Sequence, residues 1–120
     1  MEIGVDLVNI VRMKNICEKW KDKFLKRIFS EKELKEIRNK LYPWISLAGK
    51  FAAKEAFIKA CGSFLGFSWK EIEILNKNSG KPYILLSGKS LENFKKRGYE
   101  KILVSISHDF KYAISFVIIL

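Results

Sequence analysis

Apolar and polar residues alternate near both ends of the chain, which predicts strands there. Residues 3–7 read Ile-Gly-Val-Asp-Leu, so we expect a short first strand with Asp6 at its end. Residues 101–107 and 112–120 have the composition of two closing strands. The last strand is apolar at almost every position, which is typical of a strand buried on both faces. We therefore expect an oligomer, because a domain this small has little with which to cover both faces.

Apolar residues at helical spacing follow the first strand. One series begins at Ile10 and ends at Trp20, and a second occupies residues 24–29. A third helix is expected over residues 34–41, because residues 30–33 read Ser-Glu-Lys-Glu, a helix-start signal.

The longest helical pattern runs from about Trp44 to Cys61 and is closed by Gly62. We expect this helix to be the central element of the fold. Beyond it, residues 72–75 and 83–86 flank a segment rich in turn-forming residues, which predicts a β-hairpin.

The chain has 120 residues, 48% of them hydrophobic and only 2 of them proline, so we expect a single compact domain over residues 1–120. Its elements predict the α+β class, with antiparallel strands packed against a long central helix. Lys and Arg number 23 against 13 for Asp and Glu, which gives a net charge of +10. Such a charge attracts phosphates, an acidic protein or an anionic surface, and composition does not choose among them.

Three residue types restrict the chemistry further. Cys17 and Cys61 are far apart in sequence and have no close metal-type partner, which favours a reduced protein of the cytoplasm. The first residues lack a basic leader, and no apolar stretch approaches the roughly 18 residues of a membrane helix, so no membrane association is expected. Because His108 is the only histidine, a multi-histidine metal site is excluded. Any metal must be held by carboxylates, which favours a hard cation.

Charged residues in otherwise apolar segments are the candidates for chemistry. One face of the long helix presents, in order, Ala48, Ala52, Glu55 and Lys59. The two small residues leave room for a ligand beside the carboxylate and the ammonium, although Glu55 and Lys59 also fit an ordinary surface ion pair. Asp6 interrupts the first strand, where it either requires a nearby cation or caps the helix that follows.

Two of these acidic residues lie in segments that together form a specific pattern. Residues 4–6 read Gly-Val-Asp, and residues 51–60 read Phe-Ala-Ala-Lys-Glu-Ala-Phe-Ile-Lys-Ala. This pair of motifs resembles the 4′-phosphopantetheinyl transferases. Three further segments extend the resemblance to the short bacterial branch of that family, over essentially the whole chain: residues 47–49 (Leu-Ala-Gly), 80–82 (Gly-Lys-Pro) and 105–108 (Ser-Ile-Ser-His).

The resemblance implies a reaction. Coenzyme A would donate its phosphopantetheine arm to a serine hydroxyl of acyl carrier protein, with release of adenosine 3′,5′-bisphosphate, for fatty acid biosynthesis. The family requires magnesium, and Mg²⁺ is usually held by one or two carboxylates together with phosphates and waters, a set that Asp6 and Glu55 with a diphosphate would supply. The serine needs a base, for which Glu55 and a water held by the ion are both candidates.

The resemblance also implies roles for the lysines of the long helix. Lys59 would stabilise charge on the phosphate oxygens as the bond breaks, so Asp6, Glu55 and Lys59 form the expected catalytic set. Lys54 would help to bind phosphate. Lys50 stands where this branch commonly has arginine, so the bidentate fork to phosphate is lost and Lys50 is a doubtful ligand.

Two further segments are implied in coenzyme A binding. Gly80, Lys81 and Pro82 would line the nucleotide, although a plain hairpin turn needs no ligand. Ser107 and His108 would hold a phosphate of coenzyme A from a neighbouring subunit, since the resemblance implies a homotrimer with active sites between subunits. Without the resemblance, His108 is a polar strand terminus.

The basic charge is concentrated between Arg12 and Lys40, where 11 Lys or Arg accompany 5 acids and supply +6 of the +10. A solvated helical face is one interpretation. The resemblance implies another, in which the first helix binds the acidic carrier protein through Arg12, Lys19 and Lys23, and complementary charge speeds their encounter.

A small nucleic-acid-binding module is the alternative function. The net charge of +10 and several aromatic residues could supply phosphate contacts and base stacking. This alternative does not explain Asp6 and Glu55, because carboxylates repel a phosphate backbone. We therefore favour the enzyme.

Overall fold

The computed structural model describes the backbone of residues 1–120 and every side chain except those of residues 20 and 21. Two residues used above, Trp20 at the end of an apolar series and Lys21 in the basic segment, therefore have side chains outside the described residues. None of the helices combines the length and the apolar composition needed to cross a membrane, as judged over the described part of the chain.

The chain is of the α+β class, as predicted. Its elements follow in the order β1 (Glu2–Asn9), α1 (Ile10–Ile28), α2 (Glu31–Ile37), α3 (Pro43–Cys61), a 3₁₀ turn (Trp69–Glu71), β2 (Ile72–Asn76), β3 (Pro82–Leu86), α4 (Gly88–Lys96), β4 (Ile102–His108) and β5 (Tyr112–Ile119).

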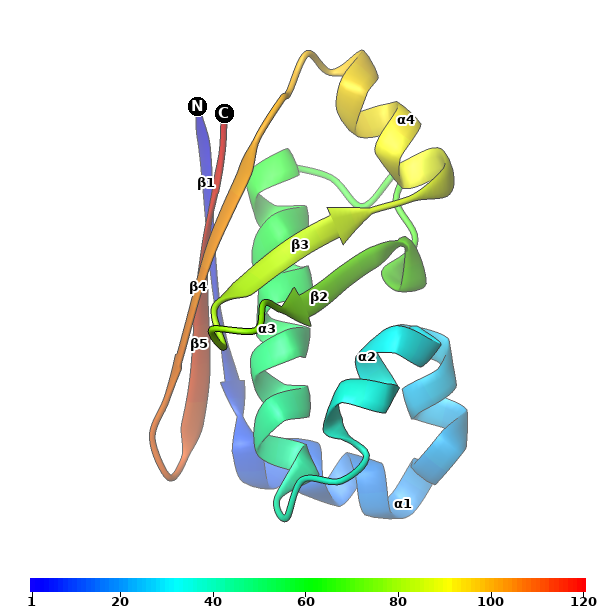
Figure 1. Ribbon diagram of the computed structural model, residues 1–120, viewed down its shortest axis with the longest axis vertical. Helices are drawn as coiled ribbons and strands as arrows, with labels where there is room; N and C mark the ends of the chain where they lie inside the picture. The colour runs from blue at the N-terminus through cyan, green and yellow to red at the C-terminus, as the bar shows by residue number, and fades with distance from the viewer.

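Antiparallel strands form two sheets around the long helix α3. The larger sheet has the order β1-β5-β4, and the hairpin β2-β3 forms the smaller one. Figure 1 shows the larger sheet standing along one side of α3, with α1 and α2 gathered near one end of that helix and α4 lying across it from β1. The long helix is therefore central, as the sequence predicts.

Three boundaries differ from the prediction. A single helix, α1, replaces the two short helices expected over residues 10–29, because Cys17 and Phe24 pack against the same apolar cluster as Ile10. Helix α2 ends at Ile37, and Leu41 beyond it is 79% exposed. Asp6 lies inside β1 rather than at its end, and the helix cap is Asn9, whose side-chain oxygen accepts a hydrogen bond from the Arg12 nitrogen.

The closing strand β5 is buried on one face only. Ala113, Val117 and Ile119 are buried beneath the sheet, whereas Ile114 and Phe116 alternate with them and are exposed. A single chain therefore leaves one face of β5 uncovered, as expected for a domain this small. The exposed face continues onto β1 through Val5, which pairs with Phe116.

Gly4 allows β1 to lie directly against α3. A Cβ atom at this position would overlap the carbonyl oxygen of Ala56 and would lie 2.8 Å from the backbone nitrogen of Ala60. Both alanines are buried in the cluster that fills the space between α3 and the sheet. Only glycine permits this approach, because the obstacle is helix backbone that has no freedom to move aside.

A buried ion pair joins α2 to the side of α3 away from this contact. The Lys54 ammonium lies 2.7 Å from Oε1 of Glu33, and both side chains are fully buried. At the predicted helix start, Glu33 completes a capping box with Ser30, and its Oε2 accepts a hydrogen bond from the Ile74 nitrogen at 3.0 Å. Burial lowers the pKa of Lys54, and the charge of Glu33 opposes that shift.

We predict that Gly4→Ala destabilises the fold by about 3 kcal/mol or more, because the new methyl group must push β1 away from α3. The free energy of unfolding in urea measures this loss. The matched control is Gly98→Ala, where no atom lies within 4 Å of the added Cβ and only the positive φ of 83° adds strain, a cost of about 1–2 kcal/mol. Equal destabilisation by the two substitutions would contradict the close approach.

Candidate active site

Asp6 and Glu55 line one pocket although 48 residues separate them in sequence. Asp6 comes from the helix-facing side of β1, opposite Ser115 of β5, and Glu55 comes from the side of α3 that faces β1. The pocket has a volume of about 360 Å³, and its other walls include Arg12 at the start of α1 and Phe51, one turn before Glu55. The packing of β1 on α3 through Gly4 therefore places the two predicted acids together.

The two carboxylates interact electrostatically. Partial burial raises the pKa of Glu55, the negative charge of Asp6 raises it further, and the positive charge of Lys59 lowers it. Asp6 is the more enclosed side chain of the Asp6–Lys59 pair, at 15% exposed against 54%. A half-buried pair of like charges needs a compensating cation.

Lys59 supplies one positive charge to this acid pair. Its Nζ donates a hydrogen bond to Oδ1 of Asp6 at 3.0 Å and another to the carbonyl oxygen of Val5 at 3.1 Å. The prediction of a Glu55–Lys59 surface pair is therefore incomplete, because the direct partner of Lys59 is Asp6 on the neighbouring strand. Ala48 and Ala52 on the same helix face are fully buried, so they make room for the sheet and not for a ligand.

The structure does not support the prediction that Lys54 binds phosphate. Its ammonium has three donors, and it donates hydrogen bonds to Glu33, to the carbonyl oxygen of Trp69 and to that of Ile72. No part of the side chain reaches solvent. Lys54 stabilises the fold.

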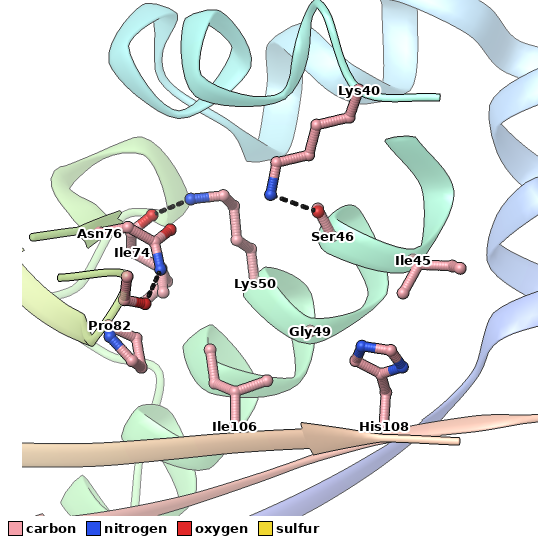
Figure 2. Close-up of a pocket in the computed structure, with 11 residues that line it drawn as sticks. Lys40, Ile45, Ser46, Gly49, Lys50, Ile74, Asn76, Pro82, Ile106 and His108 are labelled. Carbon is pink, nitrogen blue, oxygen red and sulfur yellow. Dashed lines mark hydrogen bonds between the residues drawn. The ribbon is translucent and has the colours of Figure 1, made fainter. Parts of the chain in front are cut away.

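A second pocket, of about 280 Å³, lies between the other side of α3, the β2-β3 hairpin and β4. Figure 2 shows Lys50, Ile106 and His108 arranged around this space. Gly80 and Pro82 of the hairpin also line it, so three of the predicted coenzyme A residues meet in one place. Lys81 and Ser107 are not among the lining residues, and Ser107 lies on the opposite face of the sheet from His108.

Two lysines also line this second pocket, and they differ in burial and in hydrogen bonding. Lys50 is almost fully buried and donates hydrogen bonds to Glu36 and to the carbonyl oxygen of Ile74, which agrees with the doubt about it as a ligand. Lys40 is exposed and reaches Oγ of Ser46 at 3.1 Å, as Figure 2 shows. Sequence reasoning missed Lys40 and Ser46, because Lys40 falls at the end of the basic run and carries no motif of its own.

The acid pocket and the second pocket lie on opposite sides of α3. Glu55 and Ser46 are nine residues apart, which places them about 180° apart around a helix. The strands that contribute, β1 and β4, are the two edges of the larger sheet. The two pockets have no described lining residue in common.

The three predicted docking residues all lie on α1 and line adjoining hollows. Arg12 and Lys19 line one of about 470 Å³, and Arg12 also reaches the acid pocket. Lys23 lines another of about 470 Å³ beside the half-buried ring of Phe24. The helix therefore carries cations and apolar side chains from the acid pocket outward.

The donor set at the acid pocket fits a hard divalent cation. The carboxylates of Asp6 and Glu55 face one pocket, and the Lys59 ammonium contacts Asp6 there. Mg²⁺ needs only one or two carboxylates where phosphates and waters complete its coordination. Among the described side chains, no group of three or more His, Cys, Asp or Glu is close enough to hold a metal ion without such help.

The chain is similar to known proteins over nearly its whole length. The sequence model of the 4′-phosphopantetheinyl transferase superfamily matches residues 2–117. A relative named holo-[acyl-carrier-protein] synthase, from Caldanaerobacter subterraneus, is 44% identical over 97% of this chain and 91% of its own length. The crystal structure of holo-[acyl-carrier-protein] synthase from Neisseria meningitidis superposes with a TM-score of 0.92 at 30% identity, covering 99% of this chain and 97% of that one. The Helicobacter pylori enzyme, solved in complex with coenzyme A, gives a TM-score of 0.86 at 34% identity, covering 98% and 99%.

We predict that Glu55→Gln stabilises the metal-free protein at pH 7 by less than about 1 kcal/mol, a small gain because the group is partly exposed. Because the pKa of Glu55 is raised in the folded protein, protonation of Glu55 stabilises the fold. This stabilisation is fully present below the ordinary pKa of 4.5 and is lost as the pH rises through the raised pKa. Glutamine does not ionise, so the variant does not lose this stabilisation at pH 7. Urea unfolding in EDTA at pH 7 and below pH 4.5 measures the difference, which should disappear at the acid pH.

The exposed Glu92→Gln on α4 is the control for this measurement. A Glu55→Gln protein no more stable than Glu92→Gln at pH 7 would show that Glu55 is not held at an electrostatic cost.

Proposed function

Since this chain belongs to the 4′-phosphopantetheinyl transferase superfamily, we infer that it transfers 4′-phosphopantetheine from coenzyme A to a serine hydroxyl of acyl carrier protein. Adenosine 3′,5′-bisphosphate is the other product, and the modified carrier serves fatty acid biosynthesis. The observation that carries this conclusion is the acid pair of Asp6 and Glu55 in one pocket, within a chain that matches the family over nearly its whole length. The nucleic-acid-binding alternative gains no support from the comparisons.

We propose that Asp6 and Glu55 hold Mg²⁺ during this reaction. The bound ion would neutralise charge on the diphosphate of coenzyme A. The serine hydroxyl also needs a base, and Glu55 and a water held by the ion are the two candidates. Lys59, which contacts Asp6, would place its ammonium on a phosphate oxygen that gains charge as the bond breaks.

The nucleotide part of coenzyme A is proposed to occupy the second pocket. Gly80, Pro82 and His108 line it, and Lys40 supplies an exposed ammonium for phosphate. Lys81 stays in the proposal because it follows Gly80 in the turn. Ser107 stays as a residue on the opposite face of β4 from His108, where it would contact coenzyme A held by a neighbouring subunit.

A homotrimer is the proposed assembly. The acid pocket of one protomer and the second pocket of another must face each other if one coenzyme A is to contact both, which requires head-to-tail contacts that close into a ring. The exposed apolar face of the larger sheet supports this, since Val5, Ile114 and Phe116 are each more than 40% exposed.

We propose that the acidic carrier protein binds along α1 through Arg12, Lys19 and Lys23. The adjoining hollows and their cations suit a partner that presents acids around an apolar side chain. The cytoplasm remains the proposed location, supported by the two unpaired cysteines, Cys17 and Cys61.

The direct test is transfer of label from coenzyme A to apo carrier protein, with Mg²⁺ or with EDTA. We expect transfer only with the metal, and we expect Glu55→Gln and Asp6→Asn each to lower kcat/KM about a hundredfold or more. Glu92→Gln is the control for removal of a distant acid. Metal-independent transfer, or near-normal turnover in both variants, would refute the metal site.

Arg12→Glu should raise the KM for carrier protein about tenfold and weaken its dependence on salt, while the KM for coenzyme A changes little. Steady-state kinetics at two ionic strengths measure this. Arg38→Glu makes the same charge change at an exposed residue after α2 and should have a much smaller effect. Equal effects of the two substitutions would mean that net charge alone, and not α1, recruits the carrier.

A further inference from the structure

Lys59 occupies the position where a cation is needed by the acid pair. Its Nζ donates hydrogen bonds to Oδ1 of Asp6 and to the carbonyl oxygen of Val5, at 3.0 and 3.1 Å. Both acceptors belong to β1, an edge strand whose outer side faces no other strand of the sheet. The ammonium is thus held on β1 from a helix that passes beside it.

An ammonium and a divalent ion compete for the same carboxylate. Two cations in contact with Asp6 would repel each other strongly inside a pocket that is partly shielded from water. The Asp6 carboxylate is only 15% exposed, so it has little room to bind one cation on each side. We therefore expect a metal ion on Asp6 to weaken the pairing of Asp6 with Lys59.

The Lys59 ammonium is able to move away from Asp6. Its side chain is 54% exposed, and a lysine has a flexible stem of four carbons that can carry its ammonium through several ångströms of solvent. By contrast, Lys54 on the same helix is fully buried and bound by three acceptors. Among the described lysines of α3, Lys59 is the one that can both neutralise the acid pair and release it.

We propose that Lys59 is an exchangeable counter-ion: it neutralises Asp6 in the metal-free enzyme, is displaced by the divalent ion, and then pairs with the diphosphate of coenzyme A. This inference rests on the proposed metal-dependent transfer and adds a sequence of cation exchange to it. In this scheme a cation is bound to the acid pair at every stage. The Lys59 ammonium pairs with the phosphates when the divalent ion and coenzyme A are both bound.

The exchange makes metal and coenzyme A bind cooperatively. Metal alone must displace Lys59 into water, whereas metal with coenzyme A gives the released ammonium a new anionic partner. By linkage, each ligand then raises the affinity for the other, and part of that coupling depends on Lys59. A fixed structural lysine would produce no such dependence.

The test is the affinity of the assembled enzyme for Mn²⁺ alone, from the free-ion signal in electron paramagnetic resonance, repeated with saturating coenzyme A. Lys59→Gln removes the competing cation and should bind Mn²⁺ alone roughly fivefold more tightly than the wild type. In the presence of coenzyme A this advantage should disappear, and the affinity of Lys59→Gln for coenzyme A itself should fall. Thermal unfolding of each variant checks that the fold is retained.

Two control variants separate exchange from general charge. Lys59→Arg keeps a cation at the site, so its affinity for Mn²⁺ should match that of the wild type within about twofold. Lys95→Gln removes an exposed charge on α4, which lies across α3 from β1 (Figure 1), and reports the long-range effect of lowering the net charge.

Mn²⁺ affinity of Lys59→Gln that is equal to or weaker than that of Lys95→Gln would overturn the exchange, while leaving the transfer reaction intact. If the wild type binds no Mn²⁺ even with coenzyme A and still transfers the arm, the proposed metal site fails as well. The label-transfer assay on the same preparation distinguishes these two failures.

Discussion

The close approach of β1 to α3 at Gly4 is the constraint on which the acid pocket depends. Asp6 is two residues beyond Gly4 on the same face of β1, and Glu55 directly precedes the Ala56 carbonyl that a side chain at residue 4 would strike. The contact that excludes a Cβ is therefore the contact that brings the two acids together. Close packing of β1 on α3 holds the two acids in one pocket although their like charges repel each other.

The helix α3 contributes to both pockets, and its two sides carry charged residues of different kinds. Its β1 side carries Glu55 and Lys59, where charges are partly exposed and able to exchange partners. Its other side carries Lys50 and Lys54, whose ammonium groups are fixed by Glu36 and Glu33. Loss of one partner from such a buried pair would leave an uncompensated charge, so these lysines anchor α2 and β2 against α3. Anchoring these elements shapes the second pocket, which Lys50 and Ile74 line.

Much of the fold could be predicted from the sequence because it has local signals, such as the helix start at Ser30 and the long pattern ended by Gly62. The pairing of Asp6 with Glu55 came from the family resemblance, because the local signals also fitted a helix cap and a surface ion pair. The burial of Lys54 could not be predicted, because its partner Glu33 is 21 residues away and the pairing exists only in the folded chain. Lys40 was missed for a similar reason, since only the tertiary fold brings it to the pocket that His108 also lines.

The central claim is that one divalent ion is shared by Asp6 and Glu55 in the presence of coenzyme A. The most direct measurement is an anomalous difference map from crystals of the enzyme grown with Mn²⁺ and coenzyme A. A single peak within coordination distance of a carboxylate oxygen from each of the two residues is the predicted result. A peak that touches only one of them, or that lies away from both, would contradict it.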